Sequence, residues 1–545
     1  MILAIAVPIM VQNGITNFVG LLDNIMVGMV GTEQMSGVAI VNQLMFVFNI
    51  SIFGAISGAG IFSAQFYGSG NHEGVRHTFR FKLIFSALII VVAGLLFLVW
   101  GESFISMYLH GEEDAAGLAL ALDQGRKYML VMIVGMIPFG IEQVYTSTLR
   151  ECGETVIPMK AGIVAVLVNL VLNYILIFGK FGAPVLGVVG AAVATVISRF
   201  IEAGIVIRWT HCHKKKNPFI TGAYRSLYIP GSLVRQIVIK GMPLMVNEVL
   251  WAGGMATLMQ CYSVRGLAAV AGINISSTIG NVFNVVYLAL GNSVAIIIGQ
   301  LLGAGKMDEA RDTDTKLIAF SVCLCLGIGA VLALLAPLFP MIYNTTDEVK
   351  ALATSFIRVI ALYMPMGAFL HASYFTLRSG GKTIVTFVFD SVFMWVVSIP
   401  CAYVLSRYTA VPIVPLYFAC QMIEIIKCVI GYVLVKKGIW LQNIVEGESA
   451  SENCFPSAAL QAEEAETACR TRFPGQEVRM KKRRGAVTLI GSGRPEVKVC
   501  DIINGIPKVK RVEKGEYIEF RLRYSLFHRE IKRYDKETFE EIKRR

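Results

Sequence analysis

Charged residues are scarce in this sequence. Asp, Glu, Lys and Arg make up 16% of its 545 residues, whereas 55% of the residues are hydrophobic. In a typical soluble protein about 25% of the residues are charged. The mean hydropathy of +0.61 points the same way. The composition excludes an ordinary soluble domain and indicates a membrane protein built of helices, because backbone groups in hydrocarbon must be hydrogen-bonded internally.

Motifs for nucleotide, metal and redox chemistry are also absent. No G-x-x-x-x-G-K-[ST] motif occurs, so direct ATP hydrolysis is unsupported. None of the eleven cysteines forms a C-x-x-C motif, and several lie within apolar stretches, where we expect them to pack without a metal or a disulfide. We expect no cofactor. The net charge of +12 lies mostly in connections and the tail, and we expect no nucleic-acid partner.

Long apolar stretches recur as far as residue 436. Twelve of them can cross a bilayer core of about 30 Å at ~1.5 Å per helical residue. The first six are residues 1–28, 35–60, 79–100, 124–148, 157–178 and 184–208. The second six are residues 237–262, 267–300, 316–340, 350–376, 383–406 and 411–436. The first has no basic n-region, so we interpret it as a retained span rather than a signal peptide. Met1 lies directly inside this span, which is compatible with a missing N-terminal lead.

Basic residues gather in alternate connections between these stretches. Examples are Arg76, Arg80, Lys82, Lys214, Lys215, Lys216, Arg378, Lys382, Lys436 and Lys437. Lys and Arg are enriched in cytoplasmic loops. We therefore predict a multi-pass protein of the plasma (inner) membrane with both termini in the cytoplasm.

The sequence contains an internal repeat. At an offset of 235, residues 8–76 align without a gap with residues 243–311, and fourteen of the 69 pairs are identical. The identities include Pro8/Pro243, Gly31/Gly266, Asn49/Asn284, Gln65/Gln300, Gly68/Gly303, Gly70/Gly305 and Arg76/Arg311. Apolar composition alone would not favour Gly, Gln, Asn and Arg. Farther on, Leu149-Arg150 matches Leu377-Arg378 at an offset of 228.

The repeat predicts an all-α polytopic fold of two homologous six-helix lobes. We expect residues 1–210 to form the first lobe, 211–236 a cytoplasmic linker, 237–440 the second lobe and 441–545 a short, basic, soluble tail. An even number of helices keeps both copies in one orientation, so the lobes should face each other across a midplane cavity. Rocking of the lobes would then give alternating access.

Acids within the apolar stretches are the candidate functional residues, since an intramembrane acid needs partners or water. Asp23 lies in the first stretch, and Asn169 and Asn173 share one face of the fifth. Two plainer interpretations stay open: an interfacial acid for Asp23, and interhelical hydrogen bonding for the asparagines. Glu248 aligns with Asn13, so each half carries an acid in its opening helix. We expect the cavity to be lined by Glu248, Asp390, Asn13, Gln43 and Trp251.

These residues resemble the multidrug and toxic compound extrusion (MATE) family of cation-coupled efflux transporters. The resemblance covers about residues 1–440. It rests on Val7–Ile9, Leu22–Gly28, the Gln65/Gly68/Gly70 and Gln300/Gly303/Gly305 loops, Leu149–Thr155, Gly187–Ser198 and Met242–Trp251. It implies no enzyme but a monomeric antiporter in the lipid bilayer, exporting organic, usually cationic, amphiphilic compounds in exchange for H⁺ or Na⁺.

The resemblance also suggests roles for individual residues. Asp23 matches the family's first-helix acid, and Asn169 and Asn173 match an Asn…Asp pair in the fifth helix. Asp23 and Asn169 would be the ligands if the ion is Na⁺, but the missing second acid favours protons. A flippase of lipid-linked precursors is the alternative, although it would need several intramembrane basic residues, which appear few. An enzyme would have to use His371 and Arg358, which lack partners at helical spacing.

Overall fold

A computed structural model describes residues 2–108, 115–343 and 345–445, together with five strand segments between 478 and 535. The chain divides into two compact units, Met1–Glu446 and Gly447–Arg545. The first unit is helical throughout its regular structure. The second contains the strands. The first unit carries every candidate functional residue named above.

Twelve helical segments make up the described part of the first unit. The first lobe contains α1 (Ile2–Gly28), α2 (Thr32–Gly68), α3 (His72–Ser106), α4 (Ala115–Glu151), α5 (Val156–Phe178) and α6 (Gly187–Cys212). The second contains α7 (Gly231–Ser263), α8 (Leu267–Gly303), α9 (Met307–Leu335), α10 (Asp347–Ser379) and two composite spans, Thr383–Tyr408 and Ile413–Lys436. Short 3₁₀ turns lie at Lys180–Gly182, Pro218–Ile220 and Pro340–Ile342. The expected all-α fold of two six-helix lobes is confirmed.

Ten of these segments, among the residues that are described, are long and apolar enough to cross a membrane. The other two are α1 and α7, the opening helices of the two lobes. In α1 the described apolar stretch is Leu3–Thr16. The two helices therefore hold a corresponding place in the two copies, and both carry the acids and amides discussed below.

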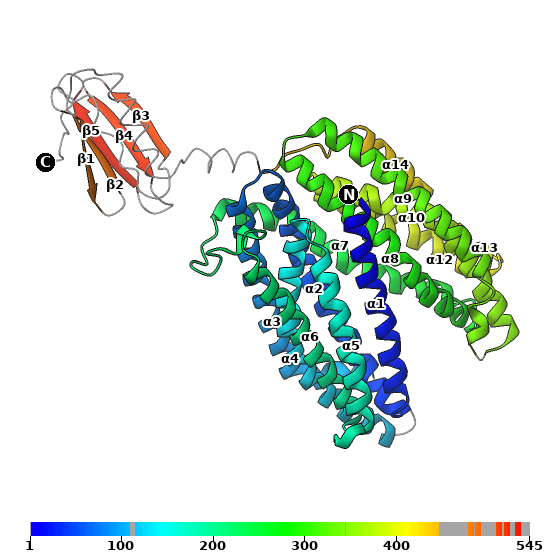
Figure 1. Ribbon diagram of the computed structural model, residues 1–545. Helices are drawn as coiled ribbons and strands as arrows, with labels where there is room; N and C mark the ends of the chain where they lie inside the picture. The colour runs from blue at the N-terminus through cyan, green and yellow to red at the C-terminus, as the bar shows by residue number, and fades with distance from the viewer. Residues whose placement is uncertain are drawn as a thin grey trace. The chain divides into compact units, whose positions relative to one another are not determined.

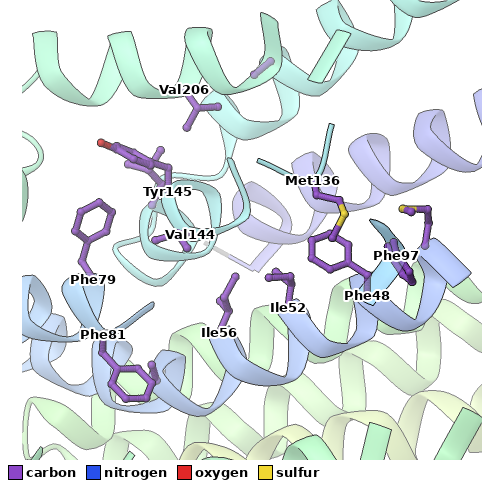
Figure 2. Packing of buried hydrophobic residues seen from close by; sticks show 14 of the residues in the cluster. Phe48, Ile52, Ile56, Phe79, Phe81, Phe97, Met136, Val144, Tyr145 and Val206 are labelled. Atoms are coloured by element: carbon purple, nitrogen blue, oxygen red, sulfur yellow. The ribbon is translucent and has the colours of Figure 1, made fainter. Parts of the chain in front are cut away.

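Apolar cores hold each lobe together and are shared in part: Ile5 and Ile9 of α1 belong to a second-lobe core, and Leu233 and Ile237 of α7 belong to the first-lobe core. In the first lobe α2 packs against α3 and α4, α4 packs against α6, and α5 packs against both α1 and α6. Figure 2 shows part of this core, where Phe79 and Tyr145 meet edge to face with ring centroids 5.1 Å apart. In the second lobe α10 packs against α8 and α9. The cores fix the helices on which the polar side chains lie.

The lobes meet where α2 and α8 end, a region we call the contact end (Gln65–Gly68 and Gln300–Gly303). In Figure 1 the helices of the two lobes lie close together near the N-terminus and diverge away from it. The Gln65 amide Nε2 donates to the Ser379 carbonyl at 2.9 Å, and the Gln300 Nε2 donates to the Glu151 carbonyl at 2.7 Å. The two repeated glutamines thus each bind the backbone of the opposite lobe.

Several helices run beyond the apolar stretches that predict them. The third begins at His72 rather than 79, and the ninth begins at Met307 rather than 316. Apolar composition marks only the part in hydrocarbon, whereas a helix continues to its cap. At the start of α3, the Asn71 side chain provides that cap by accepting from the Gly74 N–H at 2.8 Å.

The last two spans are interrupted. The eleventh consists of α11 (Thr383–Phe387), π-helical turns at Val388–Val392 and Met394–Ser398, and α12 (Ile399–Tyr408). The twelfth consists of α13 (Ile413–Met422) and α14 (Ile425–Lys436). Turns of this kind occur frequently at functional sites, and Asp390 lies within the first of them.

The segment after α14 belongs to the first unit, although the tail is expected from residue 441. The Ile444 N–H donates to Gln65 Oε1 at 2.8 Å, and Val445 is fully buried. The second unit contains β1 (Val478–Arg483) paired antiparallel with β2 (Ala486–Gly491). A second, antiparallel sheet has the order β3 (Lys508–Lys514), β4 (Tyr517–Arg523) and β5 (Arg529–Asp535).

The contact end requires glycine. A Cβ at Gly68 would lie 1.9 Å from the Gln300 carbonyl oxygen, whereas a Cβ at Gly327, in α9, would meet nothing within 4 Å. Gly68→Ala should lower the unfolding temperature by a few degrees, since such overpacking costs about 1–3 kcal/mol. Gly327→Ala should instead raise it slightly through helix propensity. Thermal unfolding of both purified variants tests this, and equal shifts would contradict the proposed contact.

Candidate cation site

The acid of the first lobe faces two asparagines. Asp23 lies near the end of α1, and α5 packs against this helix. The Asn173 Nδ2 donates to Asp23 Oδ1 at 2.5 Å and to Asn169 Oδ1 at 3.1 Å. The Asn169 amide in turn reaches Thr195 Oγ1 of α6 at 3.3 Å. We call Asp23, Asn169, Asn173 and Thr195 the first-lobe cluster.

The Asn169 amide can take two orientations within this cluster. Turning the Asn169 amide places its nitrogen 2.9 Å from Asp23 Oδ1 and lets its oxygen accept from Thr195. When the amide is not turned, the Asn169 Oδ1 faces the Asp23 Oδ1, and the two oxygens need a positive charge or a proton between them. The Asn173 Oδ1 is buried with no hydrogen-bond partner. An orphaned buried oxygen calls for a ligand, so these residues fit a proton or a small cation.

Two further acids are buried in the first lobe. Glu142 on α4 and Glu202 on α6 are 1% and 4% exposed. The Thr146 hydroxyl donates to Glu142 Oε1 at 2.5 Å, and the Arg199 Nη1 donates to Glu202 Oε2 at 2.9 Å. Arg199 also interacts electrostatically with Asp23. The first-lobe cluster is therefore linked by charge to a second acidic pair.

The second lobe has its own polar cluster around Asp390. The Asn247 Nδ2 of α7 donates to Asp390 Oδ2 at 3.1 Å, and the Lys427 Nζ of α14 donates to Asp390 Oδ1 at 3.1 Å. The Ser391 hydroxyl donates to Asn247 Oδ1 at 2.7 Å. Lys427 also lies 3.6 Å from Glu424. We call these five residues the second-lobe cluster.

A cavity of about 120 Å³ lies between the lobes beside the contact end, lined by residues of α2, α4, α8 and α10. Arg150 and Arg378, which are repeat equivalents, both line it. Arg150 donates to Gln12 Oε1 at 2.6 Å, and the Arg378 guanidinium lies 5.3 Å from the centre of the Phe375 ring. Drug-sized ligands occupy about 300–1,000 Å³. This cavity is too small for one in the present conformation.

The predicted cavity residues are dispersed. Glu248 is half-buried and interacts electrostatically with Arg378 and Asp390. Asn13 is half-buried, Gln43 is exposed and Trp251 is 39% exposed. Among the described residues, no hydrogen bond or ion pair joins Asn13, Gln43 or Trp251 to either cluster. Their place in a substrate cavity stays a prediction.

Sequence reasoning missed the ionic pairs of the two sixth helices. At an offset of 225, α6 aligns with residues 412–437, and Arg199 and Glu202 align with Glu424 and Lys427. Both pairs are salt bridges between residues three apart, with the charges reversed. A realignment of the sixth spans would have shown them. An alignment at the offset of 235 does not show these pairs, because the offset between the two copies decreases along the chain to 225 at the sixth helices.

Several basic residues are buried within the helical unit. Lys82, Arg378 and Lys427 are 1%, 7% and 5% exposed. Lys82 and Lys427 bind the acids Glu151 and Asp390. Paired in this way, the two lysines do not offer free positive charge to a pyrophosphate.

Two six-helix lobes with buried acids and a cavity between them are typical of a membrane transporter. The family model MatE matches the chain twice, at residues 8–175 and 243–404. The chain belongs to the MatE family. The two matches begin 235 residues apart, at the offset of the internal repeat.

Named relatives agree with this assignment. The chain is 26% identical over 414 residues to the probable multidrug resistance protein NorM of Thermotoga maritima, covering 75% of this chain and 85% of that protein. It is 26% identical over 404 residues to the multidrug resistance protein MdtK of Pectobacterium atrosepticum, covering 74% and 86%.

Solved structures show the same fold. An outward-facing multidrug resistance MATE family transporter of the MOP superfamily superposes with a TM-score of 0.71 at 18% identity, covering 80% of this chain and 94% of that one. The crystal structure of MATE in complex with MaD3S superposes with a TM-score of 0.72 at 19% identity, covering 80% and 95%. At such identities the likeness shows the fold alone.

The two alternative functions considered from the sequence are a lipid flippase and an enzyme. These comparisons do not support a lipid flippase. Members of the family are transporters, not enzymes, and His371 forms no catalytic set: its Nδ1 lies 3.0 Å from the Gly367 carbonyl oxygen, while Arg358 is exposed. No group of three or more His, Cys, Asp or Glu side chains suited to a metal ion occurs among the described residues.

A second carboxylate should strengthen cation binding at the first-lobe cluster. Asn173→Asp places it beside Asp23, and two unit charges at 4 Å interact by roughly 4 kcal/mol at an effective dielectric constant near 20. We expect Na⁺ to bind this variant at least tenfold more tightly than the wild type, measured by calorimetry in detergent. Asn281→Asp, at an exposed position on α8, is the control. Unchanged affinity in Asn173→Asp would contradict the cation site.

Proposed function

We propose that this transporter is a secondary antiporter that exports organic, cationic and amphiphilic compounds in exchange for H⁺ or Na⁺. The observation that carries the proposal is the first-lobe cluster, in which an acid and amide oxygens converge with an orphaned oxygen on Asn173. The multidrug resistance proteins NorM and MdtK among the relatives support the substrate class. No nucleotide-binding motif offers another energy source.

Exchange follows from competition between two ligands for two conformations. A cation bound at Asp23 stabilises one arrangement of α1 against α5, and the organic substrate favours the other. A ligand shifts such an equilibrium only by its differential affinity for the two states. Each ligand therefore weakens the binding of the other, so that cation entry and substrate exit occur in alternate half-cycles.

The contact end provides the barrier on one side of the membrane. The basic connections support a cytoplasmic location for that end and for both termini under the positive-inside rule. The lobes then open toward the outside of the plasma (inner) membrane. Since the inter-lobe cavity is too small for a drug-sized molecule, substrate entry from the cytoplasm requires the Gln65 and Gln300 hydrogen bonds to break.

The ion remains open between two candidates with different demands. For Na⁺, Asp23 and Asn169 would supply oxygen ligands, with the Asn169 oxygen turned toward the acid. For H⁺, a single carboxylate is sufficient and the asparagines only position it. The presence of one acid rather than two favours protons. A monomer suffices in either case, since one chain contributes both lobes.

Asp23→Asn should abolish gradient-driven efflux. The substitution keeps size and hydrogen bonding but removes titration and cation affinity. In proteoliposomes loaded with a cationic dye, we expect at least a tenfold loss of efflux under an imposed H⁺ or Na⁺ gradient, whichever drives the wild type. Dye binding in the absence of a gradient should persist, with weakened affinity.

The matched control is Asp123→Asn on α4, where the acid is exposed and pairs with Lys127 and Gln124. It should transport at the wild-type rate. Wild-type efflux by Asp23→Asn under both gradients would show that this acid is not the coupling residue.

A further inference from the structure

Lys427 is a buried ammonium within the second lobe. The residue is 5% exposed on α14. Its Nζ lies 3.1 Å from Asp390 Oδ1 and 3.6 Å from Glu424 Oε1. Burying one positive charge between two carboxylates is stable only because all three charges share the site.

Two aromatic rings complete the surroundings of this ammonium. The Lys427 Nζ lies 5.7 Å from the ring centres of both Phe389 and Phe393, which flank Asp390 in the π-helical region. Carboxylates and aromatic faces are the groups with which proteins bind organic ammonium ions. We call Asp390, Glu424, Phe389 and Phe393 the second-lobe cage.

The remaining oxygens of the cage acids are already bound. The Asn247 Nδ2 donates to the second oxygen of Asp390, and the Tyr363 hydroxyl donates to Glu424 Oε2 at 2.6 Å. Each carboxylate thus has a fixed neutral donor on one oxygen and faces Lys427 with the other. The cage is organised around one positive charge, and the chain supplies that charge itself.

The first lobe is built from equivalent helices, but among its described residues no lysine is bound to Asp23. In both lobes an amide and an acid bridge the first and fifth helices: Asn173 to Asp23, and Asn247 to Asp390. The sixth helix provides the contrast, because Arg199 is bound to Glu202 while Lys427 binds the bridging acid directly. One lobe leaves its acid to an exchangeable ion, and the other fills the equivalent place permanently.

We propose that Lys427 is a tethered cation that occupies the second-lobe cage, so that the exchangeable coupling cation binds only in the first lobe. Occupancy of the cage by Lys427 does not depend on what the protein transports or on whether it is an antiporter. The restriction of coupling to the first lobe rests on the proposed antiport function. Lys427 therefore determines the specificity of cation binding rather than stability alone.

Vacating the cage should create a site for a free ammonium. Lys427→Ala removes the atoms that n-propylammonium would replace. We expect this salt to raise the unfolding temperature of Lys427→Ala in a saturable manner, with at least tenfold tighter apparent binding than to the wild type. n-Propanol, which lacks the charge, should have no such effect.

The matched control is Lys436→Ala on the same helix. Lys436 is exposed and contacts the Tyr432 ring at 5.5 Å without a carboxylate partner in the described part of the chain. n-Propylammonium should act on this variant as weakly as on the wild type. If n-propylammonium stabilised the wild type, Lys427→Ala and Lys436→Ala equally, or stabilised none of them, the proposed cation cage would be wrong.

A second pair of variants keeps the proposal testable if Lys427→Ala does not fold. Lys427→Gln removes the charge, keeps most of the side-chain length and offers an amide oxygen that can ligate Na⁺ beside Asp390 and Glu424; it is combined with Asp23→Asn to remove the first-lobe acid. Na⁺ should raise the unfolding temperature of the double variant but not that of Asp23→Asn alone. No Na⁺ effect in a folded double variant would overturn the proposal.

The restriction to one lobe has its own measurement. Cation-dependent stabilisation of the wild type, by H⁺ or Na⁺, should disappear in Asp23→Asn. If it persists there and is lost in Asp390→Asn, the exchangeable cation binds in the second lobe and Lys427 does not exclude it. These readouts need no gradient, so they stand even if the protein is shown not to be an antiporter.

Discussion

A charge buried among apolar helices is stable only when other polar groups enclose it, and this constraint organises both lobes. Asp23 has amides, Glu151 has Lys82, and Asp390 has both an amide and an ammonium. The partners come from different helices, so each pair also fixes helix against helix. A change in the charge of one acid would therefore alter the packing of a lobe, and this is how the proposed antiporter would couple an ion to a movement.

The sequence predicted the fold because the duplication is visible in residues with demanding roles. Gly68 and Gly303 recur because a Cβ would strike the opposite backbone. Asp23 was found because an acid stands out in an apolar stretch, and Asn169 and Asn173 because a spacing of four places them on one face. These signals lie within single helices, where spacing alone determines proximity.

Other features depend on contacts across helices, and spacing does not reveal them. Lys427 is near the end of the twelfth stretch and resembles an ordinary boundary lysine until the fold brings Asp390 beside it. Helix ends were misplaced for a related reason, since apolar content marks the bilayer while caps such as Asn71 end the hydrogen bonding. The π-helical turns around Asp390 likewise leave no mark in the hydropathy.

The contacts at the end of α2 and α8 are reciprocal. Gly68 meets the Gln300 carbonyl, and Gly303 meets the Gln65 carbonyl. Since the repeat relates Gly68 to Gly303 and Gln65 to Gln300, equivalent surfaces of the two lobes contact each other. Such self-complementary contact is the hallmark of an interface between identical subunits related by a two-fold axis. The contact therefore has the geometry of an interface between two copies of a six-helix subunit, present here within one polypeptide whose halves carry different charges.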